Sequence, residues 1–295
     1  MAIKNILVPL SGHGDASDLQ EAPLRVALTV GRRLGARVEA LHVSPDPRDA
    51  VVFVGEGMTS TMIEGIISAA EHEGTERSRR TRAFFDRLCA EFDAPRADAD
   101  TPGVDTGFCA ELIERIGRED EQVACRGRLA DLIVASRPHS DREAGPPLTL
   151  ETALRETGRP VLVTPPNASG TFGEIIAIAW NGSIEASRAV AFALPYLVQA
   201  KRVVVMSVEE GRPLGPSGRD LVAYLARHSV AADEAAVGDG GGRSIGKTLL
   251  AEAAGAGADM MVMGAYTRSR MRRLIFGGAT SEVLSNTEIP VLMVH

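Results

Sequence analysis

The stretch Ile175-Ile-Ala-Ile-Ala-Trp-Asn-Gly182 decides the fold, because its pattern occurs twice in the chain. A short apolar run that ends at a turn residue and a glycine is typical of a buried strand. The earlier occurrence is Asn5-Ile-Leu-Val-Pro-Leu-Ser-Gly12, which also passes from an apolar run into a polar residue and a glycine. The same succession of strands and helices is therefore expected to occur twice along the chain.

Two further pairs of matching strands follow in the same order. Asp131-Leu-Ile-Val corresponds to Asp259-Met-Met-Val, and Arg159-Pro-Val-Leu-Val corresponds to Ile289-Pro-Val-Leu-Met. Three matched pairs in one order indicate a duplication of the whole unit rather than a chance likeness between single strands.

Strands and helices are expected to alternate along both copies, which predicts an α/β protein with parallel sheets covered by helices on both faces. The expected strands are residues 5–10, 38–43, 131–136, 160–163, 175–180, 203–208, 232–237, 259–263 and 290–294. The expected helices are residues 19–34, 66–92, 110–129, 148–157, 184–198, 220–228, 245–254 and 281–287. The assignment of residues 97–104 stays open.

A length of 295 residues suits two domains, each large enough to bury its own core. The Pro- and Gly-bearing stretch 165–170 reads as the boundary, so we expect a first domain over residues 1–168 and a second over residues 169–295. Ser11 and Asp131 lie 120 positions apart, whereas their counterparts Asn181 and Asp259 lie 78 apart. The first copy therefore carries a longer insertion, placed mainly after its second strand.

Composition excludes several classes of function. The net charge of −7 argues against nucleic acid as a main partner, because phosphate backbones are bound through clustered Lys and Arg. No apolar run reaches membrane-spanning length and the start does not resemble a signal peptide, so we expect a cytoplasmic protein with no membrane partner. The three cysteines lack Cys-x-x-Cys spacing and the six histidines are scattered, so no metal site is predicted.

The stretch from Gly264 to Thr280 has the character of an anion-binding loop. It joins an apolar strand to a short helix, and Gly277 and Gly278 stand directly before that helix. Free N–H groups at the amino end of a helix suit phosphate, and glycine lets a ligand approach the backbone closely.

These motifs resemble the universal stress protein family in its tandem two-domain form, over nearly the whole chain. The family signature is a strand ending in Asp-Gly-Ser, a second strand ending in His-Val, and Gly-x-x-Gly, nine residues, then Gly-Ser or Gly-Thr. The second copy shows Asn181-Gly-Ser183, Ser207-Val208, Gly264 with Thr267 in the place of the second glycine, and then Gly277-Gly278 and Thr280.

The resemblance implies two tandem Rossmann-like domains, each an open parallel five-stranded sheet with helices on both faces. Family members commonly pair through their last strands. The resemblance therefore implies an internal pseudo-dimer joined through residues 160–163 and 290–294, and it leaves a homodimer of the whole chain open.

The resemblance also implies a site for ATP or another adenine nucleotide in the second copy, with Mg²⁺ on the phosphates. Carried over residue by residue, the positions are Asn181, Val208, Gly264, Thr267, Gly277, Gly278, Ala279 and Thr280. Three of them depart from the family pattern: Asn181 lacks the charge of Asp, Thr267 adds a β-branched side chain, and Gly278 lacks a hydroxyl.

The first copy departs much further from the family pattern. Ser11-Gly12-His13 replaces Asp-Gly-Ser, and Ser136-Arg137-Pro138 replaces the start of Gly-x-x-Gly. Residues 141–147 offer no glycine pair, and only His42-Val43 persists. The first copy is expected to be a structural partner with a degenerate site.

The function expected from the resemblance is an ATP-binding regulator of the stress response, not an enzyme. One alternative is an interaction scaffold that binds no nucleotide. Another is an ATPase, because Gly241-Gly-Arg-Ser-Ile-Gly-Lys-Thr248 satisfies the phosphate-loop pattern. That loop needs a firm strand before it and a metal-binding Asp at the carboxyl end of a strand, whereas Asp259 stands at the start of one, so the glycine-rich start of a helix is the preferred interpretation.

Overall fold

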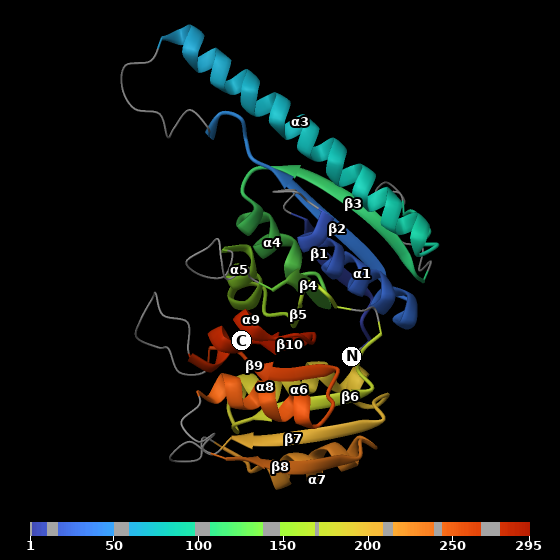
Figure 1. Cartoon of the computed structure of the whole chain (residues 1–295). Coiled ribbons are helices and arrows are strands. Elements are labelled where there is room, and N and C mark those ends of the chain that lie inside the picture. The colour runs from blue at the N-terminus through green and yellow to red at the C-terminus, as the bar shows by residue number, and fades with distance from the viewer. Residues whose placement is uncertain are drawn as a thin grey trace.

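One ten-stranded sheet runs through the whole molecule in the computed structural model (Figure 1). The strand order is β3-β2-β1-β4-β5-β10-β9-β6-β7-β8. The structure describes residues 2–10, 17–49, 59–97, 107–137, 148–168, 171–208, 215–238, 244–266 and 278–295. We call the part with β1 to β5 the first half and the part with β6 to β10 the second half.

The two halves repeat one order of strands and helices. The elements of the first half are β1 (Asn5–Leu10), α1 (Ser17–Leu34), β2 (Arg37–Ser44), α3 (Ser60–Glu91), β3 (Cys109–Ile116), α4 (Glu119–Gly127), β4 (Leu132–Ser136), α5 (Leu148–Glu156) and β5 (Val161–Thr164). The elements of the second half are β6 (Ile175–Trp180), α6 (Ile184–Leu197), β7 (Arg202–Val208), α7 (Gly218–Arg227), β8 (Ala232–Val237), α8 (Ile245–Gly255), β9 (Met260–Gly264), α9 (Gly278–Asn286) and β10 (Val291–Val294).

The predicted joining of the halves through their last strands is confirmed. Strands within each half pair in parallel, whereas β5 and β10 pair antiparallel. The register sets Val163 against Val291, Leu162 against Leu292 and Val161 against Met293. Each half is therefore a five-stranded parallel sheet, and the two form one sheet.

Helices cover both faces of this sheet, as predicted for parallel strands. Residues of α1, α3, α6 and α7 contribute to the core on one face, and residues of α4, α5, α8 and α9 contribute to the core on the other. The core on each face contains strand residues of both halves, among them Leu162 and Leu292 on the first face. The apolar runs predicted as buried strands thus lie between two layers of helices.

The predicted helix over residues 110–129 is wrong in its first part, while its second part forms α4 (Glu119–Gly127). Residues 109–116 form strand β3, which pairs in parallel with β2 from Arg37 opposite Cys109 to Ser44 opposite Ile116. Gly117 then takes a φ of 129°, which suits glycine alone, and α4 starts two residues later. The Ala, Glu and Leu residues of this stretch favour a helix locally, but pairing with β2 overrides that preference.

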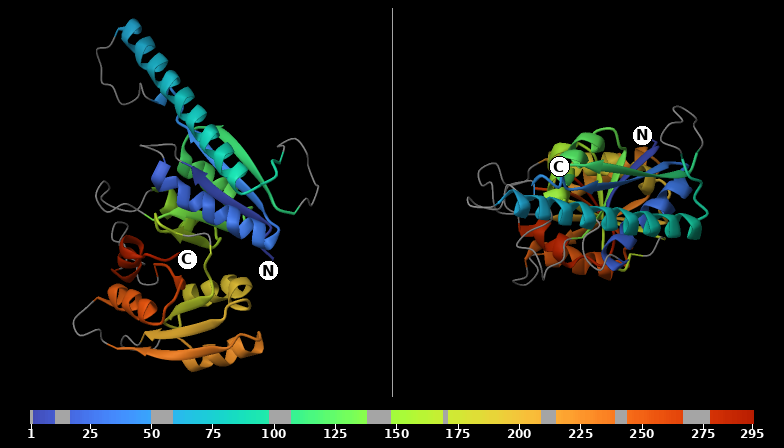
Figure 2. Two further views of the ribbon diagram at one scale, coloured as in Figure 1. Left: turned by 45° about the vertical axis from the view of Figure 1, so that its right-hand side comes forward. Right: turned by 90° about the horizontal axis from the view of Figure 1, so that it is seen from above.

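The longer insertion of the first half is largely the helix α3, which has 32 residues against ten in its counterpart α7. The buried residues of α3 are Arg77, Thr81, Phe85, Leu88 and Cys89, which all belong to its carboxyl-terminal half. The amino-terminal end projects beyond the rest of the molecule (Figures 1 and 2). The predicted polar helix at 66–92 is therefore confirmed, and it starts earlier than expected.

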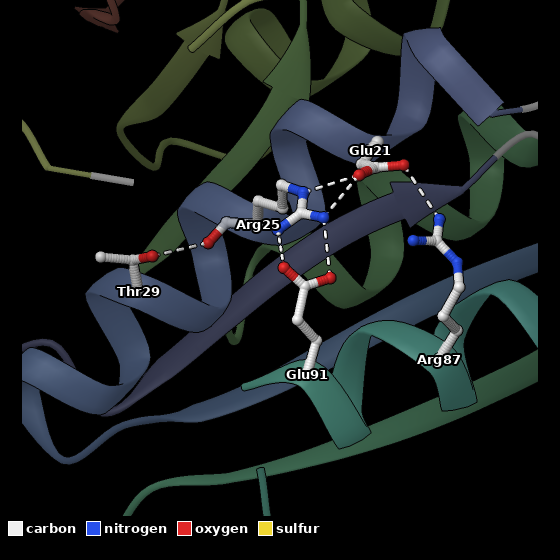
Figure 3. Close-up of polar contacts among 5 residues, drawn as sticks. All are labelled: Glu21, Arg25, Thr29, Arg87 and Glu91. Carbon is white, nitrogen blue, oxygen red and sulfur yellow. Dashed lines mark hydrogen bonds and ion pairs between the residues drawn. The ribbon is translucent and has the colours of Figure 1, made fainter. Parts of the chain in front are cut away.

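Ion pairs fasten the carboxyl-terminal half of α3 to α1 (Figure 3). Arg25 binds both Glu91 on α3 and Glu21 on its own helix, and Arg87 on α3 donates to Glu21 at 2.9 Å. Burial works against the charged form of Glu21, but the hydrogen bonds from Arg87 and Arg25 outweigh it and hold the pKa of Glu21 below its usual value.

Candidate functional site

The expected site lies at the point of the second-half sheet where the strand order reverses, beside β6. β6 and β9 are parallel neighbours, and β7 lies on the other side of β6. In open α/β sheets the crevice outside the carboxyl ends of two such strands is the usual place for a ligand. Asn181 directly follows β6 and Gly264 ends β9, so both lie at this edge.

Asn181 shapes the turn that starts helix α6. Its Oδ1 accepts a hydrogen bond from the Ser183 N–H at 3.1 Å, and the Ser183 Oγ accepts one from the Ala186 N–H at 3.1 Å. Ser183 is therefore the N-cap of α6. Within the described residues, no hydrogen-bond partner of the Asn181 Nδ2 is found, so this group can still donate to a ligand.

Residues 215–217, which precede α7, contact the turn after β6. A Cβ on Gly215 would lie 2.3 Å from the Gly182 carbonyl oxygen, so the two backbones touch here. The Trp180 Nε1–H donates to the Pro216 carbonyl at 2.9 Å, and the ring is 6% exposed within the core. Trp180 therefore packs in the core and holds this segment through its indole N–H. Val208 ends β7, where it pairs with Val237.

The reason for glycine at position 264 differs from the expected one. A Cβ there would lie 2.6 Å from the Ala186 nitrogen and 2.8 Å from the Glu185 carbonyl carbon. The first turn of α6 therefore occupies the space beside the Gly264 Cα, which the sequence analysis reserved for a ligand. Gly264 lets α6 pack on the end of β9.

The start of α9 returns to the end of β9. The Thr280 Oγ1 accepts a hydrogen bond from the Tyr266 N–H at 3.3 Å, and Thr280 is buried. Gly278 is exposed and a Cβ on it would meet no atom within 4 Å, while Ala279 is half-buried. Thr267 and Gly277 lie outside the described residues, so the structure brings together Asn181, Gly264, Gly278, Ala279 and Thr280 of the predicted set.

Tyr266 is a residue of this edge that the sequence analysis did not single out. Its φ is 61°, and its ring lies 5.9 Å from the ring of His295. Burial and the nearby Glu151 raise the pKa of Tyr266 to about 12, against the influence of Arg155. Tyrosine carries no sequence signal for a left-handed backbone, so only the structure could find it.

The phosphate-loop alternative is not supported by the described part of its motif, residues 244–248. The Gly246 N–H donates to the Glu282 carboxylate at 3.1 Å, so a negative charge already occupies the start of α8. The Asp259 carboxylate accepts hydrogen bonds from the N–H groups of Gly173, Glu174 and Ile175, each at 3.0 Å. Asp131 binds Lys4 and Asn5 in the same way in the first half, so this aspartate serves the fold in both halves.

The corresponding edge of the first half is built differently. His42 is fully buried and its Nδ1 lies 2.9 Å from the Leu10 carbonyl, while the Ser44 hydroxyl lies 3.2 Å from that of Ser78 on α3. Arg137, which follows β4, donates to the Thr287 carbonyl of the second half at 2.8 Å. Its side chain holds the halves together.

Across the described ranges, no group of three or more His, Cys, Asp or Glu residues is placed to bind a metal ion. No helix in the same ranges is both long enough and apolar enough to cross a bilayer.

Comparison with known proteins gives a family for the second half. Residues 174–295 match the sequence model of the Universal stress protein family. No curated protein matches the sequence. A universal stress protein from Archaeoglobus fulgidus has a similar structure, with a TM-score of 0.68 and 15% identity over 98% of this chain and 95% of that one. A putative universal stress protein from Pseudomonas aeruginosa gives a TM-score of 0.52 and 14% identity over 99% and 93% of the two chains. At these identities the structural likeness shows the fold of the full chain.

Proposed function

We propose that this chain, whose second half belongs to the universal stress protein family, binds ATP or a related adenine nucleotide at the edge formed by β6, β9 and α9. Mg²⁺ would come with the phosphates. The nucleotide would regulate the protein in the stress response.

The convergence of β6, β9 and α9 is the observation that carries this proposal. Asn181 and Gly264 end neighbouring parallel strands, and the Tyr266–Thr280 hydrogen bond brings the start of α9 to the same edge. Gly278 in the first turn of α9 is exposed, and a Cβ added there would meet no atom within 4 Å. A helix start that offers free N–H groups beside a glycine suits phosphate.

Recognition of the base would fall to the turn after β6. A carboxamide offers both a donor and an acceptor, and the Asn181 Oδ1 is already engaged with the Ser183 N–H. The Asn181 Nδ2 is therefore the group that would donate to a ring nitrogen of adenine. This polarity is the reverse of that of the family's Asp, which only accepts.

Three carboxylates of this half already have structural partners. Asp220 closes a capping box with Ser217, Glu282 holds the start of α8, and Asp259 holds the start of β6. A carboxylate with such a structural partner is poorly placed to accept a proton from an attacking water.

Calorimetry with ATP and Mg²⁺ tests the proposal, together with mass spectrometry of small molecules released from the purified protein. Gly278→Val should abolish binding while the melting temperature stays unchanged, because the position is open to solvent. Gly255→Val is the matched control, since it places the same side chain on another exposed helical glycine with no atom nearby. An absence of released nucleotide, together with no binding by the wild type, would overturn the proposal.

The scaffold function remains a second candidate because of α3. Its first seventeen residues, 60–76, include no buried side chain, and this part projects from the molecule (Figure 2). A projecting helix is available to a partner. If Gly278→Val removes nucleotide binding yet cells keep their normal response to stress, the scaffold is favoured over the nucleotide-binding regulator.

A further inference from the structure

The backbone of Tyr266 needs an explanation that local structure does not give. Three non-glycine residues have a positive φ among those described: Asp93, Ser229 and Tyr266. Asp93 and Ser229 each follow the C-cap of a helix, where a left-handed residue is common. Tyr266 instead follows strand β9, and its Cβ makes the left-handed region unfavourable. Such residues persist only where surrounding contacts hold them, and they concentrate at functional sites.

Contacts within the second half hold the backbone that leads into Tyr266. The Ala265 N–H donates to the Val294 carbonyl at 2.8 Å, and the Tyr266 N–H donates to Thr280 at 3.3 Å. The ring packs edge-on against His295, and Tyr266 is 5% exposed. The Tyr266 backbone therefore links the end of β9 to the start of α9 through this hydrogen bond.

An arginine of the first half covers the Tyr266 ring. The guanidinium carbon of Arg155 lies 4.3 Å from the ring centroid, a distance at which a cation is attracted to the face of an aromatic ring. The Arg155 Nε also lies 3.0 Å from the Glu151 carboxylate one turn earlier on α5. Glu151 thus holds Arg155 from the same helix. Both side chains of this ion pair are 35% exposed, so Arg155 remains at the surface.

The antiparallel pairing of β5 with β10, which we call the seam, explains why Arg155 reaches the Tyr266 ring. Val161, the first residue of β5, pairs with Met293 near the end of β10. The last turn of α5 lies five residues before β5, so it stands beside the carboxyl ends of the second-half strands. The first half thus presents a residue at the ligand edge of the second half.

We propose that Tyr266 is a positioning residue of the nucleotide site, and that Arg155 of the first half holds it in its left-handed conformation. We call this pair the Arg155–Tyr266 clasp. The inference rests on the proposed function, because the positioned element is the start of α9, to which the proposed function assigns the phosphates. It gives the first half a role in a site to which its own degenerate motifs do not contribute.

Two arginines of the first half allow a matched test. Arg155→Met removes the cation and keeps the length of the side chain, and Arg155→Lys restores a cation. Arg33 is the control, because it also reaches the second half, where it donates to Gln199 at 2.9 and 3.1 Å and to the Phe172 carbonyl at 3.4 Å. Arg33→Met therefore removes a contact between the halves that involves neither Tyr266 nor α9.

ATP affinity in the presence of Mg²⁺ is the first readout, measured by calorimetry on the full chain. Arg155→Met should weaken binding by about threefold to tenfold, the range expected from the loss of one cation–π contact. Arg155→Lys should restore most of the affinity, and Arg33→Met should leave it unchanged. Equal effects of Arg155→Met and Arg33→Met would overturn the positioning role, because they would indicate general loosening between the halves.

Hydrogen exchange of the Tyr266 amide, measured by NMR without nucleotide, is the second readout. This amide donates to Thr280, so it should exchange faster in Arg155→Met and at the wild-type rate in Arg33→Met. Unchanged exchange in Arg155→Met would overturn the clasp even if ATP binds. If the wild type binds no adenine nucleotide, the proposed function and the positioning role fall, while faster exchange would still support the clasp as a structural contact.

Discussion

Leu162 of β5 and Leu292 of β10 are paired across the antiparallel seam that joins the two halves, and they are 0% and 1% exposed. Both belong to one core that includes strand residues from both halves, such as Val8 and Ile178. Because apolar contacts continue through the seam, the halves are expected to unfold together.

Truncation at the seam should therefore be costly. Leu162→Ala and Leu292→Ala should each lower the free energy of unfolding by about 2–5 kcal/mol, the usual cost of deleting a buried leucine side chain. Their effects should not add in the double variant, since the residues are in contact. Denaturant unfolding followed by circular dichroism measures both quantities. Leu129→Ala, at a position that is 80% exposed, is the control. Two separate transitions in the wild type would contradict the single unit.

Gly264 should be sensitive to a single added methyl group. Gly264→Ala should destabilise the chain by about 1–3 kcal/mol, because the new Cβ meets backbone atoms of α6 that cannot move aside easily. Gly278→Ala should leave stability unchanged or slightly raise it, since its Cβ meets nothing within 4 Å. Thermal melts of the two variants compare these glycines directly. A tolerated Gly264→Ala would show that α6 does not pack on the end of β9 as described.

Lys247→Ala should change neither ATP affinity nor stability. Lys247 is exposed, and the Gly246 N–H beside it is already bonded to Glu282. Calorimetry and a phosphate-release assay should give wild-type values for this variant. A loss of nucleotide binding or of hydrolysis on removing Lys247 would instead restore the phosphate-loop interpretation.

The ion pairs between α1 and α3 should contribute to stability only while their carboxylates are charged. The hydrogen bond from Arg25 lowers the pKa of Glu91, and the pKa of Glu21 is also lowered. A lowered pKa in the folded chain gives stability that is complete above the ordinary Glu pKa, about 4.3, and is lost as the pH falls through the lowered value.

Arg25→Met should accordingly lower the melting temperature at pH 7, and the difference from the wild type should shrink below about pH 4. Arg79→Met is the control. Its pair with Glu76 lies within α3, with side chains 69% and 41% exposed, and such a pair adds little stability. A difference between wild type and Arg25→Met that does not change with pH would indicate lost packing, for example on the Phe92 ring 5.7 Å away, rather than lost charge.

Much of the fold could be read from apolar runs and their repetition. The predicted strands at residues 5–10, 175–180 and 232–237 have the expected bounds, and most other elements differ by one to three residues at their ends. The failure at β3 has a clear cause. Cys109–Ile116 lies at the outer edge of the sheet, where charged residues such as Glu111 and Glu114 interrupt the apolar pattern. Only its pairing with β2 makes it a strand.

The candidate site was predictable in place but not in detail. Asn181, Gly264 and Thr280 do meet at one edge, because matching motifs in a duplicated α/β chain must follow matching strands. The partners of these residues could not be predicted. The space beside Gly264 belongs to α6, and the Thr280 hydroxyl bonds the Tyr266 backbone.

The sequence by itself determined the repeated order of strands and helices and most of the buried strands. These features depend on the order and spacing of nearby residues, which periodicity reports directly. The tertiary structure alone decided that Leu162 meets Leu292, that Arg155 of the first half covers Tyr266 of the second, and that Glu282 occupies the start of α8. Each of these is a contact between residues far apart in the chain, and it is set by how the strands pair and the helices pack, which no local pattern encodes.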